Sequence, residues 1–206
     1  MDGTLLDSME GWATAGEKYL RRRGLTPRGD ERDSLLGQGM LRAALYFQEA
    51  YGIEDDVAVM IEEIKREVRD YYENEATLCD GVTAFLTKLS EQGVKMCVAT
   101  ATERALAEPV LERLGIRSFF DKIFTCRELD TNKTEPLIYE TARAFMGADK
   151  AQTWVFEDAL YAARTAKAAG YPVCAVYDRF ETDAAALTET ADLYIRSYRE
   201  AMDLAY

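Results

Sequence analysis

Apolar side chains recur every three or four positions through residues 9–76, and this spacing predicts helices. The repeats run through Trp12, Ala15, Tyr19 and Leu20, then Leu41, Ala44, Leu45 and Phe47, then Val57, Met60, Ile61, Ile64, Val68 and Tyr71. No convincing strand interrupts them. We therefore predict a bundle of three or four helices over residues 9–76.

From Asp80 onward, short apolar strands alternate with amphipathic helices. The predicted strands cover residues 95–99, 122–124, 153–156, 173–176 and 193–195. Gly93, Gly147 and Gly170 mark helix ends and Pro136 a helix beginning, whereas Pro109 predicts a kink or a late start in the helix over 104–114. Such alternation predicts an α/β fold, with a parallel sheet between two layers of helices. The α/β domain then comprises residues 1–8 and 77–206, and residues 9–76 are an insertion.

The composition narrows the chemistry that the chain can perform. Its 206 residues are enough for a sizeable core. Lys and Arg number 25 and Asp and Glu 37, so the net charge is 25 − 37 = −12, which disfavours a nucleic-acid partner. The chain has no histidine, which excludes Ser-His-Asp and Cys-His catalysis and the usual histidine-rich metal sites. Carboxylates, lysine, hydroxyls or thiols must therefore carry any reaction.

The cysteines and the hydropathy favour a cytoplasmic protein. Four cysteines lie apart in the sequence without a Cys-x-x-Cys pair, and we expect buried, reduced thiols rather than a disulfide or metal set. No apolar run approaches the ~18 residues of a membrane span, and the N-terminus lacks a signal pattern. We expect no membrane partner, and a monomer or a weak homodimer.

Ligands bind at the carboxyl ends of the strands in parallel sheets, so the residues that follow the predicted strands are informative. Thr100-Ala101-Thr102 follow one predicted strand, Glu157-Asp158 follow another, and Lys133 precedes the helix that begins at Pro136. We expect these segments to converge on one edge with the opening Asp2-Gly3-Thr4. One lysine, hydroxyls with backbone amides and several carboxylates suit one phosphate and one hard divalent cation.

A structural role is open for each of these segments. Thr100 and Thr102 suit a helix N-cap, and Lys133 suits a solvated loop. Glu157-Asp158 suit a surface loop, although adjacent acids repel each other unless a cation or solvent relieves them.

Two further motifs have simple interpretations. Asp7-Ser8 most simply caps the first helix. Gly37-Gln38-Gly39 is rejected as a dinucleotide fingerprint, since no strand precedes it and the third glycine is missing.

Taken in order, these motifs resemble the haloacid dehalogenase superfamily. They are Asp2-Gly3-Thr4-Leu5-Leu6-Asp7-Ser8, Val98-Ala99-Thr100, Lys133, Val155-Phe156-Glu157-Asp158, Ala162-Ala163 and Ala168-Ala169-Gly170. The match covers essentially the whole chain and is nearest to the phosphatases and β-phosphoglucomutase-like proteins. The resemblance implies a Rossmann-like parallel sheet with helices on both faces, and a helical cap domain formed by residues 9–76.

The resemblance also implies a role for each matched residue. Asp2 would be the general acid/base, and its backbone carbonyl would bind Mg²⁺ together with Glu157 and Asp158. Thr100, Gly3, Thr4 and Ala101 would bind the phosphoryl group, and Lys133 would balance its charge. The implied activity is a phosphatase acting on a small phosphorylated metabolite.

This sequence departs from the family pattern in its first motif. The aspartate that attacks phosphorus would stand immediately before Met1, so it is absent from the chain, as is the first strand of the family's sheet. A sequence that starts late, or a shortened form of the protein, would explain the absence of the nucleophile and the first strand. We favour this explanation because the other site residues are all present. The alternative is a natural fragment without activity, a catalytically silent binding protein.

Other departures bear on geometry and substrate. At four positions where members of the family commonly have glycine, proline or serine, this chain has other residues: Thr134, Glu135, Ala159 and Tyr161. A β-phosphoglucomutase-like phosphomutase is disfavoured, because Trp12 stands near the position of that enzyme's cap histidine. Arg21, Arg22, Arg23 and Arg42 are candidate contacts for a second anionic group, or alternatively a solvated helix end.

Overall fold

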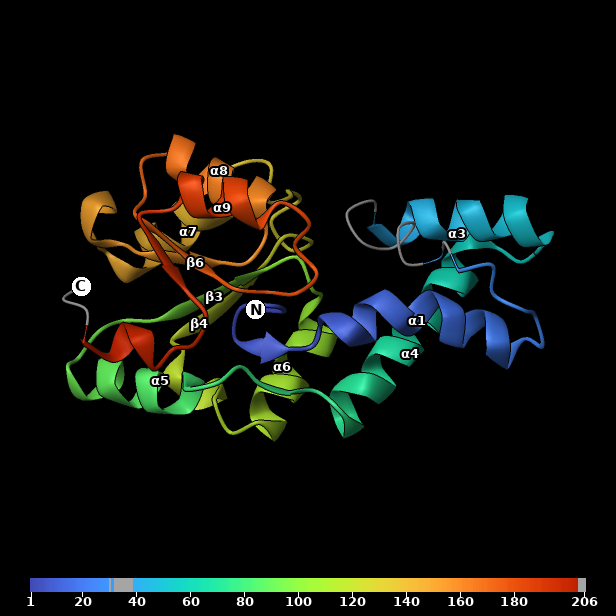
Figure 1. Cartoon of the computed structure of the whole chain (residues 1–206), viewed down its shortest axis with the longest axis horizontal. Coiled ribbons are helices and arrows are strands. Elements are labelled where there is room, and N and C mark those ends of the chain that lie inside the picture. Colours follow the sequence, from blue (N-terminus) through green and yellow to red (C-terminus); the bar gives the residue numbers. More distant parts are fainter. Residues whose placement is uncertain (30, 32–38, 204–206) are drawn as a thin grey trace. The chain divides into compact units, whose positions relative to one another are not determined.

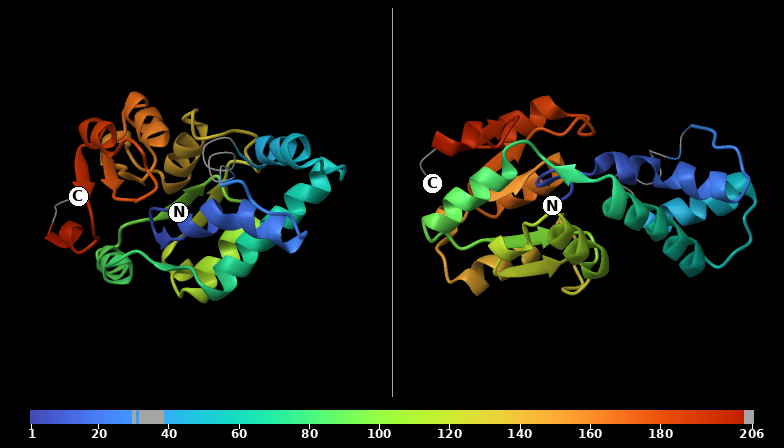
Figure 2. Two further views of the ribbon diagram at one scale, coloured as in Figure 1. Left: turned by 45° about the vertical axis from the view of Figure 1, so that its right-hand side comes forward. Right: turned by 90° about the horizontal axis from the view of Figure 1, so that it is seen from below.

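The computed structural model describes residues 1–29, 31 and 39–203, which fall into two compact units. Residues 1–7 and 77–206 make the first, and residues 8–76 the second. Figures 1 and 2 show the elements of each. Gly37 and Gln38 of the rejected glycine motif lie outside the described residues.

The second unit consists of helices. They are α1 (Met9–Arg22), α3 (Gly39–Tyr51) and α4 (Val57–Asn74). Helix α4 packs against both α1 and α3, and the rings of Tyr19 and Phe47 stack with centroids 5.7 Å apart. Gly11 lies where a Cβ would be 2.4 Å from the Tyr71 ring, so α1 and α4 approach closely.

The first unit alternates strands and helices as the sequence predicts. After β1 (Leu6–Asp7) and β2 (Thr77–Leu78) come α5 (Val82–Glu91), β3 (Cys97–Thr100), α6 (Arg104–Arg113), β4 (Lys122–Thr125), α7 (Leu137–Met146), β5 (Val155–Glu157), α8 (Leu160–Ala168), β6 (Val173–Val176), α9 (Ala184–Thr190) and β7 (Leu193–Ile195). Short 3₁₀ helices cover Arg117–Phe119, Lys150–Gln152 and Glu200–Asp203.

The parallel strands form two sheets. β3 pairs with β4, and β5-β6-β7 form a three-stranded sheet, while β1 and β2 make a separate antiparallel pair. Helices α5 and α6 cover one face of the strands, and α7, α8 and α9 the other (Figure 1). The α/β architecture is confirmed, but β3 and β5 are not hydrogen-bonded to each other in the part of the chain described.

Several local predictions need correction. Pro109 lies inside α6, which begins at Arg104, so the late start is wrong and the kink stays a prediction. Ser8 holds the N-cap position of α1, but its side chain makes no capping hydrogen bond. Glu103 is the N-cap residue of α6, so Thr100 and Thr102 do not cap that helix.

Other features agree with the sequence. Gly147 ends α7 with φ +66°, the left-handed conformation that glycine adopts without a steric penalty. All four cysteines are free thiols, with Cys126 and Cys174 buried and Cys79 and Cys97 partly so. Among the described helices, none combines the length and the apolar character needed to cross a membrane.

Candidate active site

The opening loop is a tight turn that only glycine allows at its centre. The backbone N–H groups of Leu5 and Leu6 donate to the carbonyl of Met1 at 2.7 and 3.1 Å. Gly3 has φ +65°, and a Cβ there would lie 2.2 Å from Oδ2 of Asp158. The absence of a side chain at Gly3 thus lets the loop press against the carboxyl end of β5.

Thr4 joins the opening loop to Asp158. Its hydroxyl is buried and donates to Oδ1 of Asp158 at 2.6 Å, and it lies 3.4 Å from the backbone carbonyl of Asp2. The carbonyl oxygen of Asp2 and Oδ1 of Asp158, two of the oxygens expected to bind a metal ion, therefore both lie next to the Thr4 hydroxyl.

The side chain of Asp2 is held from the end of β3. The Thr102 hydroxyl donates to Oδ2 of Asp2 at 2.8 Å, and the Thr102 N–H donates to the Thr100 hydroxyl at 3.0 Å. Both threonines are buried, whereas Ala101 between them is exposed. The structure thus brings the first and second sequence motifs into direct contact.

Lys133 and Glu157 form a buried ion pair. Nζ of Lys133 donates to Oε1 of Glu157 at 2.5 Å, and the same oxygen accepts from the Tyr139 hydroxyl at 2.9 Å. Burial alone would lower the pKa of Lys133, but Glu157 outweighs it and raises the pKa above the ordinary value. Lys133 is therefore a buried cation, and the alternative of a solvated loop lysine is wrong.

Asp158 is an excess negative charge in this site. It is 9% exposed, and burial followed by repulsion from Glu157 raises its pKa to about 7. The charge of the Met1 amino group, a hydrogen bond from Thr4 and the charge of Lys133 act in the opposite direction. Two adjacent buried carboxylates repel each other here, and a bound cation would relieve that repulsion.

These oxygens suit Mg²⁺, which prefers carboxylate and carbonyl ligands. Asp158, Glu157 and the Asp2 carbonyl would hold such an ion. Within the described residues, no group of three or more Asp, Glu or Cys side chains converges to hold a metal by itself.

Sequence reasoning missed two residues of this site. Tyr139 lies on the buried face of α7 and bonds to Glu157. Asp178 follows β6, and its Oδ2 would lie 3.2 Å from a Cβ at Gly3. Burial raises the pKa of Asp178, which accepts from the Phe180 N–H at 2.6 Å. The strand-end argument that found Glu157 would have found Asp178, had it been applied to β6.

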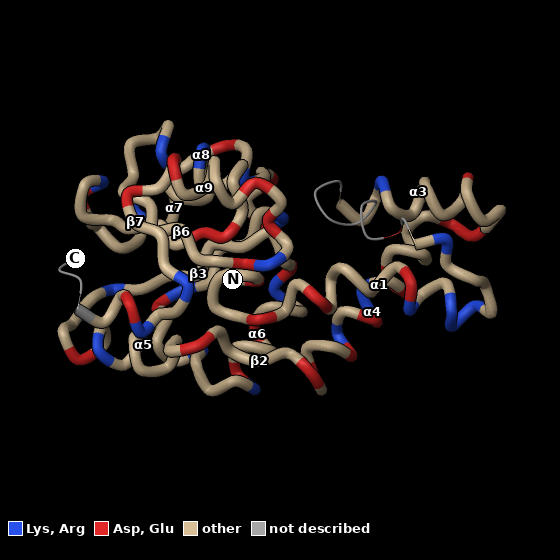
Figure 3. The backbone as a smooth tube through the Cα atoms, viewed as in Figure 1, with Lys and Arg blue, Asp and Glu red and all other residues tan. Residues whose placement is uncertain are grey.

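Three of the four candidate arginines, Arg21, Arg22 and Arg23, already have acidic partners in the helical unit. Arg22 contacts Glu67 at 3.0 Å and Asp70 at 3.1 Å, and Arg23 contacts Glu63 at 2.9 Å. Arg21 lies 3.6 Å from Glu17, and Arg42 is exposed. Basic and acidic residues are interspersed along the described chain rather than separated by sign (Figure 3).

Fold and site together define an α/β protein with a helical insertion and a buried lysine-carboxylate centre at the carboxyl ends of the parallel strands. Residues 1–176 match the family described as haloacid dehalogenase-like hydrolase. The chain belongs to this family.

Similar proteins include phosphatases. A phosphoglycolate phosphatase of Rhodobacter capsulatus is 28% identical over 176 residues, 84% of this chain and 79% of the relative. A validoxylamine A 7'-phosphate phosphatase of Streptomyces hygroscopicus subsp. limoneus is 28% identical over 204 residues, 97% and 92% of the two chains. The crystal structure of CbbY from Rhodobacter sphaeroides in complex with phosphate has a TM-score of 0.80 at 22% identity, covering 98% of this chain and 93% of that one. The first two support a phosphatase-type hydrolase, and the third supports the fold.

Proposed function

We propose that this protein is a magnesium-dependent phosphatase of a small phosphorylated metabolite. The observation that carries the proposal is the buried set of Lys133, Glu157 and Asp158 beside Asp2, which Thr4 and Thr102 hold in place. A buried lysine neutralises phosphate charge, and the paired acids suit a divalent cation.

Asp2 is the proposed acid/base. Its carboxylate is partly exposed and is fixed by the hydroxyl of Thr102 at 2.8 Å, so it has a defined position and access to substrate. The phosphoryl group would meet the Thr100 hydroxyl, the backbone of Gly3, Thr4 and Ala101, and the ammonium of Lys133. Family membership and the phosphatases among the relatives support this assignment.

In this proposal, the nucleophile that acts together with Asp2 is an aspartate placed immediately before Met1. Residues two apart on extended backbone face the same side, so the two carboxylates would flank one phosphorus atom. The nucleophile's oxygen bonds to phosphorus while the bond to the leaving oxygen breaks, and Asp2 donates its proton to that oxygen. Asp2 then takes a proton from water, whose oxygen bonds to phosphorus while the bond from phosphorus to the nucleophile's oxygen breaks, so that inorganic phosphate leaves and the carboxylate is restored. Mg²⁺, when bound, supplies stabilisation of the charge on the phosphoryl oxygens.

The remaining assignments follow from the same proposal. The helical unit would cover the substrate and exclude water. The free thiols, and the intermixing of basic and acidic residues along the chain (Figure 3), support a cytoplasmic enzyme without nucleic-acid or membrane partners. We propose that it acts as a monomer or a weak homodimer.

Turnover of p-nitrophenyl phosphate with Mg²⁺ tests the function. We expect activity from a form extended by an apolar strand ending in Asp before Met1, and loss of that activity on Asp2→Ala. The matched control is the same extension ending in Asn. Absence of turnover from the Asp form, for this substrate and a panel of sugar and organic-acid phosphates, contradicts the proposal in favour of a silent binding protein. Isomerisation of a sugar phosphate without phosphate release would instead indicate a mutase.

A further inference from the structure

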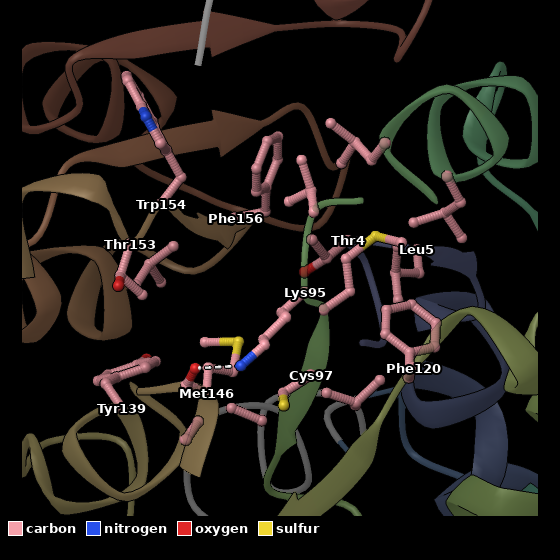
Figure 4. Close-up of a pocket in the computed structure, with 18 of the residues that line it drawn as sticks. Thr4, Leu5, Lys95, Cys97, Phe120, Tyr139, Met146, Thr153, Trp154 and Phe156 are labelled. Carbon is pink, nitrogen blue, oxygen red and sulfur yellow. Dashed lines mark hydrogen bonds between the residues drawn. The ribbon is translucent and has the colours of Figure 1, made fainter. Parts of the chain in front are cut away.

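Two tyrosines stand near the buried pair of Lys133 and Glu157, one inside the protein and one at its surface. Tyr139 is the inner one. Together with Glu157 it lines a cavity of ≈ 380 Å³, whose walls also include residues of β3, β5 and α5 (Figure 4). Tyr161 does not line this cavity, and its relative exposure is 50%. A dissolved ligand can therefore reach Tyr161, whereas Tyr139 belongs to the interior.

The position of Tyr161 is set by the start of α8. The N–H of Leu160 donates to Oε2 of Glu181 at 2.8 Å, which fixes the first turn of the helix. The next residues, Ala162 and Ala163, are fully buried, so the inner face of this turn packs against the core. Tyr161 precedes them and follows Asp158 by three positions. It thus stands at the carboxyl end of β5, where the proposed ligands of metal and phosphate gather.

The charged groups of the site act on the phenol of Tyr161. Burial raises the pKa of Tyr161, Lys133 lowers it, and Glu157 and Asp158 raise it, so that it lies above its ordinary value. The influence is mutual, because Tyr161 also raises the pKa of Lys133. Interactions between charges weaken with distance. The hydroxyl end of Tyr161 therefore lies toward the lysine and the carboxylates, and the exposed part of the residue is turned to solvent.

The hydroxyl of Tyr161 is a hydrogen-bond donor that no described residue uses. The side chain of Thr165 bonds to the backbone carbonyl of Tyr161, at 3.0 Å, and not to its hydroxyl. The neighbouring carboxylates have other donors: Tyr139 for Glu157 at 2.9 Å, and Thr4 for Asp158 at 2.6 Å. A phenol is protonated at neutral pH. Tyr161 can therefore donate to an acceptor that enters the site.

We infer that Tyr161 is a further substrate-binding residue, whose hydroxyl donates a hydrogen bond to an oxygen of the phosphoryl group beside Lys133. The inference rests on the proposed function, since it needs a phosphate ester at this centre. A phosphoryl group offers more acceptor sites than one lysine and the Thr100 hydroxyl can satisfy, and hydrogen bonds to anionic oxygens are strong. Position 161, where the chain departs from the family pattern, thereby acquires a role.

Binding of inorganic phosphate to the full chain in millimolar MgCl₂ tests the inference without any turnover. Tyr161→Phe removes the hydroxyl and keeps the ring. We expect the dissociation constant for phosphate, measured by isothermal titration calorimetry, to rise about tenfold, because a hydrogen bond to a charged group is lost. Tyr177→Phe is the matched control. Tyr177 is 45% exposed, and its ring lies 5.7 Å from the guanidinium of Arg196, so this variant should bind phosphate like the parent.

The melting temperature separates binding from a structural role. If the ring of Tyr161 only covers the buried ion pair, Tyr161→Phe binds phosphate like the parent, and Tyr161→Ala melts lower. If the hydroxyl binds substrate, Tyr161→Phe melts close to the parent and still binds phosphate more weakly. Weaker binding at an unchanged melting temperature is therefore the result that supports the inference.

Thr100→Val distinguishes failure of the inference from failure of the proposed function. Weaker phosphate binding by Thr100→Val, together with parental binding by Tyr161→Phe, would overturn the role of Tyr161 alone. Absence of phosphate binding by the parent, or parental binding by Thr100→Val, would contradict the proposed site and the inference together. Equal weakening by Tyr161→Phe and Tyr177→Phe would also overturn the inference, because the effect would not be specific to position 161.

Discussion

The ammonium of Lys133 lies 2.5 Å from Oε1 of Glu157, and both side chains are almost fully withdrawn from solvent. Removing one partner leaves the other buried without compensation, which typically costs about 3–5 kcal/mol. We expect Lys133→Met to lower the free energy of unfolding of the α/β unit by an amount in this range, measured by urea denaturation.

The double variant Lys133→Met with Glu157→Gln provides the control for this pair. It removes both charges and keeps an acceptor for Tyr139, so it should be more stable than Lys133→Met alone. Equal stability of the single and double variants would show that the pair is not coupled.

Gly3 should tolerate no side chain. Gly3→Ala adds a Cβ 2.2 Å from Oδ2 of Asp158 on top of the left-handed backbone cost of about 1–2 kcal/mol. Gly24→Ala is the matched control, because Gly24 has φ +75° with nothing within 4 Å of its added Cβ. Calorimetry should show a clearly larger loss for Gly3→Ala, and similar losses would argue against the close approach.

The Thr4 hydroxyl should stabilise Asp158 through its hydrogen bond. Thr4→Val keeps the shape but removes a donor 2.6 Å from a buried carboxylate, and hydrogen bonds to charged groups contribute about 1.5–3 kcal/mol. We expect a loss of that size in unfolding free energy, with Thr4→Ser near the parent. If Ser and Val variants were equally destabilised, packing of the Thr4 methyl group would be the cause instead.

Magnesium should raise the melting temperature of the chain through Asp158. Ligand binding to the folded state alone adds about 2.7 kcal/mol at one hundred times the dissociation constant. We expect a rise with millimolar MgCl₂ that EDTA reverses and that Asp158→Asn removes. Asp192→Asn, remote in sequence and paired with Lys167, should keep the response. A response retained by Asp158→Asn would place the ion elsewhere.

Glu31 should give the helical unit a pH-dependent stability. It is fully buried, and its carboxylate accepts from the backbone of Arg28 and Gly29 at 2.7 and 2.9 Å and from Tyr51. Burial opposes these bonds, but together they lower the pKa of Glu31 below its ordinary value of 4.5. When the pKa of a carboxyl group is lower in the folded than in the unfolded protein, the ionised group stabilises the folded state at pH values above the unfolded-state pKa. This stabilisation is lost as the pH falls through the folded-state pKa.

We therefore expect Glu31→Gln to cost about 1–3 kcal/mol at pH 7, and the difference from the parent to shrink below the ordinary pKa of glutamate. Urea denaturation of both forms at a series of pH values measures this difference directly. A difference that stays constant down to pH 3 would contradict the role assigned to the ionised carboxylate.

Much of the fold and the site could be predicted from local patterns. Helical periodicity separated residues 9–76 from the rest, and apolar runs located β6 and β7 at the residues observed. The strand-end rule selected Thr100 and Glu157, because parallel strands place their carboxyl ends at one edge of the sheet. Lys133 was selected from the loop that precedes the helix at Pro136.

Contacts between distant residues could not be predicted in this way. The hydroxyl of Thr4 reaching Asp158, and that of Thr102 reaching Asp2, depend on how loops about 100 or more residues apart meet. Tyr139 looked like an ordinary core residue of α7, since periodicity reports burial and not the partner of a phenol hydroxyl.

The sequence by itself determined the alternation of strands and helices, the helical insertion and the residue types available for chemistry, because these depend on local spacing and composition. The tertiary structure alone decided that Lys133 is buried against Glu157, that Gly3 is pressed against Asp158, and that β3 and β5 leave a cavity between them. Burial, desolvation and strand pairing arise only when segments far apart in the chain come together, so no local pattern encodes them.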